Sequence, residues 1–160
     1  MASVVNIYEP SWDAEVDRPP YRWRRSRVGR RAGCEQLGAS LFELQPGAST
    51  FPLHAHHANE ELIVVLTGHP VLRTLEGERE LAPGEVVACL TGRRGAHRLD
   101  NRGEEPARIL ILSTMNAPDV NEFPDSALLW ARRYAPGSEP TSDDVELVDA
   151  ASGLDPLTLP

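Results

Sequence analysis

Histidine and glutamate residues gather in one short stretch of the sequence, at a spacing that suits metal binding. His54 and His56 are two residues apart, so on a β-strand both side chains point to the same face. A short turn would then bring back a second strand that begins with a carboxylate, Glu60 or Glu61. Two imidazoles and a carboxylate from adjacent strands can bind a divalent transition metal and leave coordination positions open. The stretch therefore predicts a metal centre that could activate a small molecule.

A third histidine can complete this centre from a later strand. His97 lies in the segment 96–101, which we expect to be a strand, and it would give a set of three histidines and one glutamate. The alternative is that these are ordinary strand residues, but several donors at matching spacing argue against coincidence. His57 points to the opposite face from its neighbours and His69 follows a glycine in a turn, so both are expected at the rim or in solvent.

Other polar side chains of this region have simpler interpretations. Cys89 falls in an apolar run and is expected to be a small buried side chain. Asn101 is expected to form hydrogen bonds in a turn. Arg73 and Arg98 fall on expected strands and could reach a substrate carboxylate. Alternation places Arg98 on the face opposite His97, so only Arg73 remains a candidate.

The elements that must position these residues are predicted to be strands. Short runs rich in Val, Ile and Leu are separated by Gly, Pro, Asn and Asp, which is typical of an antiparallel all-β domain. The expected strands lie near residues 35–44, 49–55, 60–66, 71–76, 78–82, 85–90, 96–101 and 107–114. The one helix candidate is 126–133, with Asp125 or Ser126 as N-cap.

Length and composition limit the class of protein. The chain has 160 residues, of which 41% are hydrophobic, and this suits one ordinary globular domain. No apolar run approaches the ~20 residues of a membrane helix, so no membrane span is expected. The first residues lack the pattern of a secretory signal. Two cysteines are too few for a disulfide scaffold. We therefore expect a cytoplasmic protein.

Charge is unevenly distributed along the chain. The net charge is −8, yet the segment from Arg18 to Arg31 carries seven arginines and no acid, and residues 136–160 carry six acids and no base. A net acidic chain binds nucleic acid poorly, so no nucleic-acid partner is expected. The arginine run contains Tyr21 and Trp23 and could bind an anion or an acidic surface. We prefer a solvated or intersubunit arm, and because Arg, Trp and Tyr are enriched at interfaces we predict a homodimer.

The histidine and glycine spacings resemble the two motifs of the cupin family. The first motif, His-x-His followed by Glu and Gly, is matched by His54, His56, Glu61 and Gly68. The second is matched by Gly84, Gly92, His97 and Asn101. The second motif departs from the family pattern in two ways: Leu90 replaces a proline, and four residues rather than two separate Gly92 from His97. The resemblance covers about residues 35–115 and is closest to small single-domain bacterial cupins.

The resemblance implies a fold and a division of the chain. The fold would be the cupin double-stranded β-helix, a jelly-roll barrel that is usually homodimeric and holds a metal inside one end. We expect an extended N-terminal arm over 1–34, the barrel over 35–115, an extension with a candidate short helix over 116–135, and a mobile acidic tail over 136–160. The alternative for the tail is that residues 145–148 add a strand to the barrel.

The resemblance also selects the carboxylate. Adjacent residues on a strand face opposite ways, so only one of Glu60 and Glu61 can face the interior. The motif spacing selects Glu61, and Ile63 and Val65 would then face inward with it. The implied metal ligands are therefore His54, His56, Glu61 and His97.

The implied function is that of a metal-binding cupin with a small-molecule ligand. A bound Fe, Mn, Ni or Zn ion would suit a dioxygenase, isomerase or lyase that acts on a small polar metabolite. The alternative is a module that binds a metal and a small molecule without turnover, as a sensor or accessory protein. Only Glu60 and His57 are near enough in sequence to act as an additional acid or base, so both functions remain open.

Overall fold

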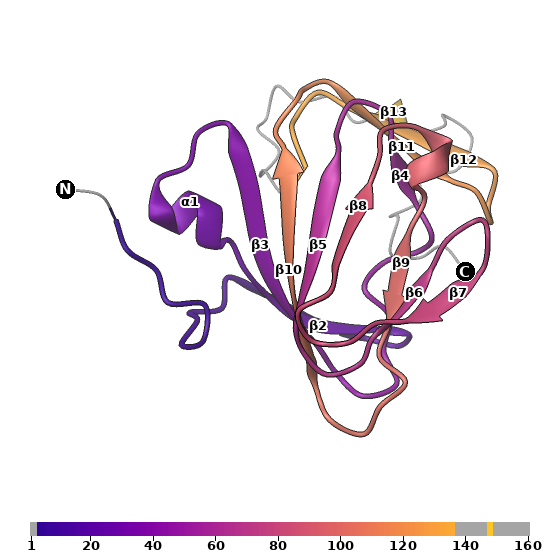
Figure 1. The fold of residues 1–160 in the computed structure, drawn as a ribbon. Coiled ribbons are helices and arrows are strands. Elements are labelled where there is room, and N and C mark those ends of the chain that lie inside the picture. Colours follow the sequence, from indigo (N-terminus) through magenta and orange to yellow (C-terminus); the bar gives the residue numbers. More distant parts are fainter. Residues whose placement is uncertain (1–2, 137–146, 149–160) are drawn as a thin grey trace.

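Antiparallel β-strands form nearly all the regular structure of the chain. The computed structural model describes residues 3–136 and 147–148, and these strands make three sheets of six, four and three strands. Figure 1 shows the six-stranded sheet opposite the two smaller sheets. The all-β fold class expected from the sequence is confirmed.

The six-stranded sheet forms one wall of the molecule, with the strand order β1-β2-β3-β10-β5-β8. Its strands, in chain order, are β1 (Ala14–Arg18), β2 (Tyr21–Ser26), β3 (Leu37–Leu44), β5 (Glu61–Thr67), β8 (Val86–Cys89) and β10 (Ala107–Thr114).

Two smaller sheets form the opposite side. The four-stranded sheet has the order β13-β12-β11-β4 and the three-stranded sheet the order β7-β6-β9. Their strands are β4 (Ala55–His56), β6 (Val71–Arg73), β7 (Glu78–Glu80), β9 (Arg98–Asp100), β11 (Asp119–Phe123), β12 (Leu128–Arg132) and β13 (Leu147–Val148).

Helical structure is limited to two short segments of the described chain. These are α1 (Val28–Ala32), which packs beside β3, and the 3₁₀ turn η1 (Arg93–Gly95). Among the described residues, no helix has the length and hydropathy needed to cross a membrane.

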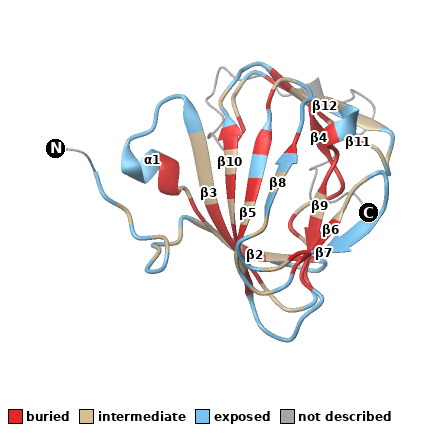
Figure 2. Cartoon of the chain, in the orientation of Figure 1, coloured by how far each residue is buried: buried red, intermediate tan, exposed pale blue. Residues whose placement is uncertain are grey.

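The core lies between the sheets, and strand alternation decides which side chains reach it. On β5, Glu61, Ile63 and Val65 are buried, whereas Leu62 is exposed on the other face. This is the orientation that the sequence predicted for the strand. Figure 2 shows the same alternation of buried and exposed positions along β5. The inward face of β5 thus continues from a carboxylate into an apolar wall.

The prediction of an extended arm over 1–34 is wrong for its second half. Strand β2 pairs with β3 in the main sheet, and the side chains of Tyr21 and Trp23 are buried in the core. Aromatic residues and arginines alternate along β2, which is a strand pattern, but the density of arginines concealed it. These two aromatic side chains therefore stabilise their own barrel, and they are not available as anchors for a partner chain.

Two further predictions about local structure are corrected. The helix expected over 126–133 is the strand β12, because its backbone pairs with β11 and this pairing outweighs helix propensity. The strand expected over 49–55 overlaps only the first residue of β4. Each of the other expected strands overlaps a strand of the structure.

Most of the acidic tail lies outside the described residues. Its described part, β13, pairs with β12, with Leu147 opposite Ala131. The alternative prediction, that residues 145–148 add a strand, is thus confirmed for 147–148. The expected mobility of the tail falls on residues that the structure does not describe.

Candidate metal centre

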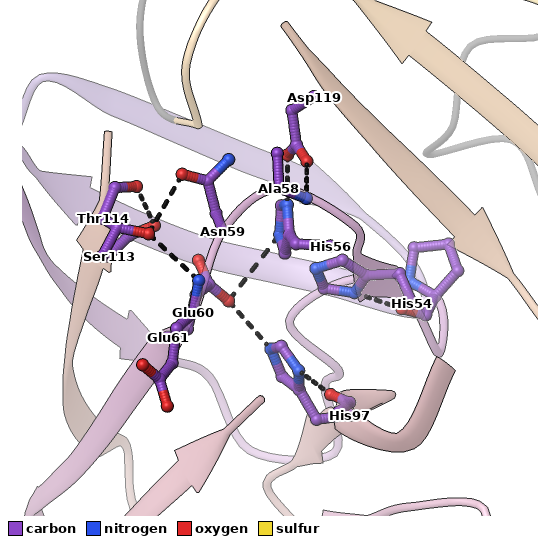
Figure 3. A network of polar contacts seen from close by, with 12 residues as sticks. His54, His56, Ala58, Asn59, Glu60, Glu61, His97, Ser113, Thr114 and Asp119 are labelled. Atoms are coloured by element: carbon purple, nitrogen blue, oxygen red, sulfur yellow. Dashed lines mark hydrogen bonds and ion pairs between the residues drawn. The ribbon is translucent and has the colours of Figure 1, made fainter. Parts of the chain in front are cut away.

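Four polar side chains meet at one end of the space between the sheets. His54 and His97 lie on two chain segments that exchange backbone hydrogen bonds, at 3.2 and 2.9 Å. His56 is the second residue of β4, and Glu61 is the first residue of β5. Figure 3 shows that the side chains of all four residues point toward a common centre.

The distances between ligand atoms suit a single ion. His54, His56 and Glu61 each offer one ligand atom, and these atoms lie within 4.8 Å of one another. Glu61 Oε2 is 3.1 Å from His97 Nε2 and 3.7 Å from His56 Nε2. The rings of His54 and His97 have their centroids 4.8 Å apart. His54, His56 and Glu61 therefore form a group that could hold an ion, and His97 lies beside this group in contact with Glu61.

Hydrogen bonds fix the tautomer of each of the three histidines. The Nδ1 atom of His54 is 2.9 Å from the Pro52 carbonyl, and that of His97 is 3.0 Å from the Gly95 carbonyl. A carbonyl oxygen only accepts, so Nδ1 carries the proton and donates it. In the neutral form of each imidazole the lone pair is then on Nε2, the usual arrangement of a histidine that binds a metal.

The third histidine is oriented by a carboxylate. His56 Nδ1 donates to Asp119 Oδ2 at 2.6 Å, and Arg132 Nη2 donates to the same oxygen at 3.2 Å. Burial raises the pKa of the Asp119 carboxyl, but its hydrogen bond with His56 outweighs burial and keeps that pKa well below its usual value. Asp119 therefore stays ionised as an acceptor and directs the Nε2 atom of His56 toward Glu61.

Two members of the cluster carry the protonation state that metal binding requires, whereas His97 does not. Burial lowers the pKa of His54 to about 3, with the positive charge of neighbouring imidazoles adding to the effect. Burial alone would raise the pKa of Glu61, but the surrounding imidazoles outweigh it and bring that pKa to about 2. His54 thus presents a neutral imidazole and Glu61 a carboxylate, which are the forms that bind a divalent ion. Burial lowers the pKa of His97, but its hydrogen bonds with Cys89 and Glu61 outweigh burial and raise that pKa well above its usual value, so a metal would have to displace a proton there.

The loop before His97 is longer than in the family motif, yet it delivers this histidine to the site. Residues 93–95 form η1, and the Gly92 N–H donates to the His56 carbonyl at 2.7 Å. A Cβ atom on Gly95 would lie 1.7 Å from the Leu90 carbonyl oxygen, so only glycine fits there. The extra residues are taken up by a tight turn that holds the Gly95 carbonyl against the His97 ring.

A cavity of about 330 Å³ opens beside the four residues. This volume is in the range of small-molecule sites. Both aromatic and polar side chains form its wall. The side chains that line it, besides the four above, include Trp23, Arg25, Phe42, Phe51, Asn121, Phe123, Trp130 and Arg132.

Comparison with known families identifies the central part of the chain. The family model described as the cupin domain matches residues 40–113. This part of the chain is a cupin domain. The matched segment contains His54, His56, Glu61 and His97. No curated protein matches the chain.

Solved structures share the fold of this cupin domain and of the strands around it. A sugar phosphate isomerase of the cupin superfamily from Silicibacter pomeroyi is 26% identical, with a TM-score of 0.71, over 83% of this chain and 80% of that one. A candidate sugar phosphate isomerase from Acidithiobacillus ferrooxidans is also 26% identical, with a TM-score of 0.68, over 72% and 73% of the two chains. The polyketide cyclase RemF from Streptomyces resistomycificus, at 24% identity and a TM-score of 0.56 over 71% and 80%, shares the fold.

The remaining histidines and the second glutamate lie outside the cavity of the cupin domain. His57 is exposed and its Nε2 is 3.0 Å from Glu122 Oε2. His69 and Glu60 are also exposed. The structure therefore places the two side chains considered as an additional acid or base away from the cavity.

The other polar residues have structural partners. Arg73, considered for a substrate carboxylate, makes two hydrogen bonds to Asp125 and does not line the cavity. Cys89 is buried in the core, and the Asn101 amide donates to the carbonyls of Leu44 and Glu105. These last two positions are as the sequence predicted.

Sequence reasoning missed the residues that support the cavity from the C-terminal strands. Asp119 and Arg132 lie on β11 and β12, far in sequence from the histidines that they serve. Arg132 belongs to the segment that was interpreted as a helix. The sequence of residues 119–123 does not alternate polar and apolar residues, and its buried face carries the polar Asp119 and Asn121, so the local pattern gave no signal.

Proposed function

We propose that the protein is a divalent-metal-dependent enzyme that acts on a small polar metabolite. One observation carries this proposal: three imidazoles, each with its Nδ1 proton held by an acceptor, turn Nε2 toward Glu61 at the wall of a ligand-sized cavity. A histidine in an apolar core needs no particular tautomer, whereas a histidine that binds a metal through Nε2 needs its proton on Nδ1.

The proposed ligands are His54, His56, Glu61 and His97. Three imidazoles, which bind a metal in their neutral form, and one carboxylate suit Fe(II), Mn(II), Ni(II) and Zn(II). A bound ion of this kind would polarise a carbonyl group or activate dioxygen. The chain itself would hold the ion with these four side chains, and its aromatic wall would exclude water from the ligand.

Isomerisation is the reaction class that the comparisons favour. The sequence leaves dioxygenase, isomerase and lyase chemistry open, and the two structures at 26% identity carry the name sugar phosphate isomerase. An aldose–ketose isomerisation moves a proton between two adjacent carbons while a carbonyl oxygen is polarised. We therefore propose isomerase-type chemistry on a small hydroxylated carbonyl compound.

The alternative function, a binding module without turnover, is favoured by a different observation. Among the described residues that line the cavity, the titratable side chains are the four proposed ligands, Arg25 and Arg132. Neither arginine is suited to take up a proton. A module that holds a metal and a ligand, as a sensor or accessory protein, needs no further acid or base.

Metal analysis and isotope exchange separate these functions. The full chain, purified without chelators or a His-tag, is expected to contain about one divalent transition-metal ion per chain. The metal-loaded protein is then incubated in D₂O with a panel of aldoses, ketoses and their phosphate esters, and NMR detects deuterium at the carbon beside the carbonyl. Exchange supports the isomerase, and dioxygen consumption would indicate an oxygenase instead. Tight binding without conversion indicates the module, and absence of metal overturns the proposal.

The homodimer stays a prediction. Tyr21 and Trp23 do not support it, since both are buried in their own barrel. Light scattering of the full chain at micromolar concentration measures the mass directly, and a monomeric mass would contradict the prediction.

A further inference from the structure

A strip of polar side chains lines the cavity on the inner face of the four-stranded sheet. It consists of Asn121 on β11 and Trp130 and Arg132 on β12, and we call it the β11–β12 strip. None of these three residues is a proposed metal ligand. The strip begins directly beside the metal centre, because Asn121 pairs with His56 of β4.

The sheet register brings these side chains together. Asn121 lies opposite Trp130 across the β11–β12 ladder, and Asp119 lies opposite Arg132. Positions two apart on a strand share a face. Since Trp130 and Arg132 are two apart and both line the cavity, their polar atoms are neighbours of the Asn121 amide on one surface.

The β11–β12 strip carries buried polar atoms without a protein partner. Among the described residues, Arg132 Nε, Trp130 Nε1 and Asn121 Oδ1 are buried and find no hydrogen-bond partner. Arg132 is only 8% exposed and Asn121 only 4%. Leaving such an atom unsatisfied costs about 1–3 kcal/mol, and nearly all buried polar groups in proteins are paired. Three such atoms on the wall of one cavity indicate the position of a ligand.

The chemistry of the three atoms defines the ligand. Arg132 Nε and Trp130 Nε1 can only donate a hydrogen bond, so they suit an oxygen that bears negative charge. Asn121 Oδ1 can only accept, so it suits a hydroxyl group. Rings hold the guanidinium in place, as the Arg132 Cζ atom lies 5.2 Å from the Trp130 ring centroid and 5.6 Å from that of Tyr134.

The charge of the site favours an anion. Asp119 pairs with Arg132, and Glu61 would neutralise half of the charge of a divalent ion, so the loaded centre would keep a positive charge. A neutral ligand would leave the charge of the loaded centre uncompensated, and buried charges are costly unless paired.

We propose that the β11–β12 strip is an oxyanion-binding subsite, and that the ligand is a small hydroxylated compound with a carboxylate or phosphate group. Its charged end is held by Arg132 and Trp130, and its hydroxyl end lies toward Asn121 and the metal centre. In naming this compound as the substrate, the inference rests on the proposed function. The binding of an oxyanion to the strip does not need turnover.

Calorimetric titration of the full chain with three matched probes tests the subsite. Glycerate carries a carboxylate, glycerol 3-phosphate a phosphate, and glycerol neither group. We expect at least one of the two anions to bind and glycerol to show no measurable binding. The ratio of the two anion affinities distinguishes the carboxylate source from the phosphate source. Equal binding of glycerol, or no binding of either anion, overturns the proposal.

Two variants and a control assign the binding to the strip. Trp130→Phe keeps an aromatic side chain but replaces the indole by a smaller phenyl group without an N–H, and it is expected to weaken anion binding about threefold to tenfold. Arg132→Gln removes the charge and is expected to weaken it about tenfold or more. Arg133→Gln changes the next residue, which is exposed, and should leave the affinity unchanged. Trp130→Phe is needed beside Arg132→Gln, because Arg132→Gln also removes a hydrogen-bond partner of Asp119 and its effect on anion affinity is therefore not specific to the strip. Wild-type affinity in Trp130→Phe and Arg132→Gln would overturn the assignment.

Metal loading separates this proposal from the proposed function. The titrations are run on metal-loaded and metal-free protein, with the metal content measured in each. If the protein takes up no metal but binds an anion in a Trp130-dependent manner, the subsite stands and the metal-dependent enzyme is rejected. If it takes up metal but binds neither anion, the metal centre stands and the subsite is rejected.

Discussion

Two buried glutamates lie on the same six-stranded sheet, but their carboxylates have different kinds of partner. Glu43 on β3 is 5% exposed and Glu61 on β5 is 9% exposed. Glu43 lies between Arg24 of β2 and Arg108 of β10, which are its partners in the sheet register, and both bind its carboxylate. Glu61 has no arginine partner among the described residues and contacts only imidazoles.

The difference separates a structural carboxylate from a functional one. Burial raises the pKa of the Glu43 carboxyl, but hydrogen bonds from Arg24 and Arg108 outweigh it and lower that pKa. Its charge is therefore compensated within the protein. Around Glu61 the neighbours are imidazoles, which, unlike arginines, can give up a proton, so a bound cation can take over the compensation of the carboxylate charge. A buried acid surrounded by oriented imidazoles is thus a stronger sign of a metal site than burial alone.

The largest effect is expected at Glu61. Glu61→Gln exchanges the charged donor for a neutral one, and metal affinity should fall on the order of a hundredfold or more. Competition with a chelating dye measures the affinity, and circular dichroism confirms that the variant is folded. Glu60→Gln is the matched control, since the exposed neighbour should leave metal content intact. If Glu60→Gln empties the site and Glu61→Gln does not, the assignment of the ligand is wrong.

A smaller effect is expected at the residue that orients His56. Asp119→Asn retains the shape of the side chain but weakens the hydrogen bond that it accepts from His56 Nδ1. Metal affinity should therefore fall about 10- to 100-fold. The same dye competition measures it, and Asn116→Ala serves as a comparison because it alters the same region without contacting a histidine. Wild-type affinity in Asp119→Asn would show that His56 does not depend on this carboxylate.

The smallest effect is expected at Glu43, and it concerns stability rather than metal. Glu43→Gln should lower the free energy of unfolding by about 1–2 kcal/mol at pH 7, because both arginines are partly exposed and the ion pairs are screened. The folded-state pKa of Glu43 lies below the ordinary value of 4.5. Its contribution is therefore present above pH 4.5 and is lost as the pH falls through the folded-state pKa.

Urea unfolding of wild type and Glu43→Gln at pH 7 and near pH 3 measures this contribution. The difference between the two proteins should shrink at the lower pH, while metal content at pH 7 stays the same. A difference that is equal at both pH values would show that the charge of Glu43 does not stabilise the fold.

The sequence was sufficient where the information is local. The alternation along 61–65 and the spacing of His54, His56 and His97 predicted both the inward face of β5 and the members of the cluster. These features depend on strand geometry, which acts over a few residues.

The sequence was insufficient where pairing between distant strands decides the structure. Asp119 reaches His56 because β11 pairs with β4, and no local pattern reveals that pairing. Arg132 and Trp130 were assigned to a helix because Leu, Ala and Arg favour helices locally, and only the β11–β12 ladder places them at the cavity. The ligands were thus predictable, whereas their supporting residues were not.

The acceptors that orient the three histidines differ in whether a substitution can remove them. For His54 and His97 the acceptor is a main-chain carbonyl, which every amino acid possesses, so no single codon change removes it directly. For His56 the acceptor is the Asp119 side chain, which one nucleotide change converts to asparagine. Within a lineage, the affinity of the centre for its ion can therefore drift through position 119 while the geometry of the other two imidazoles is inherited with the path of the backbone.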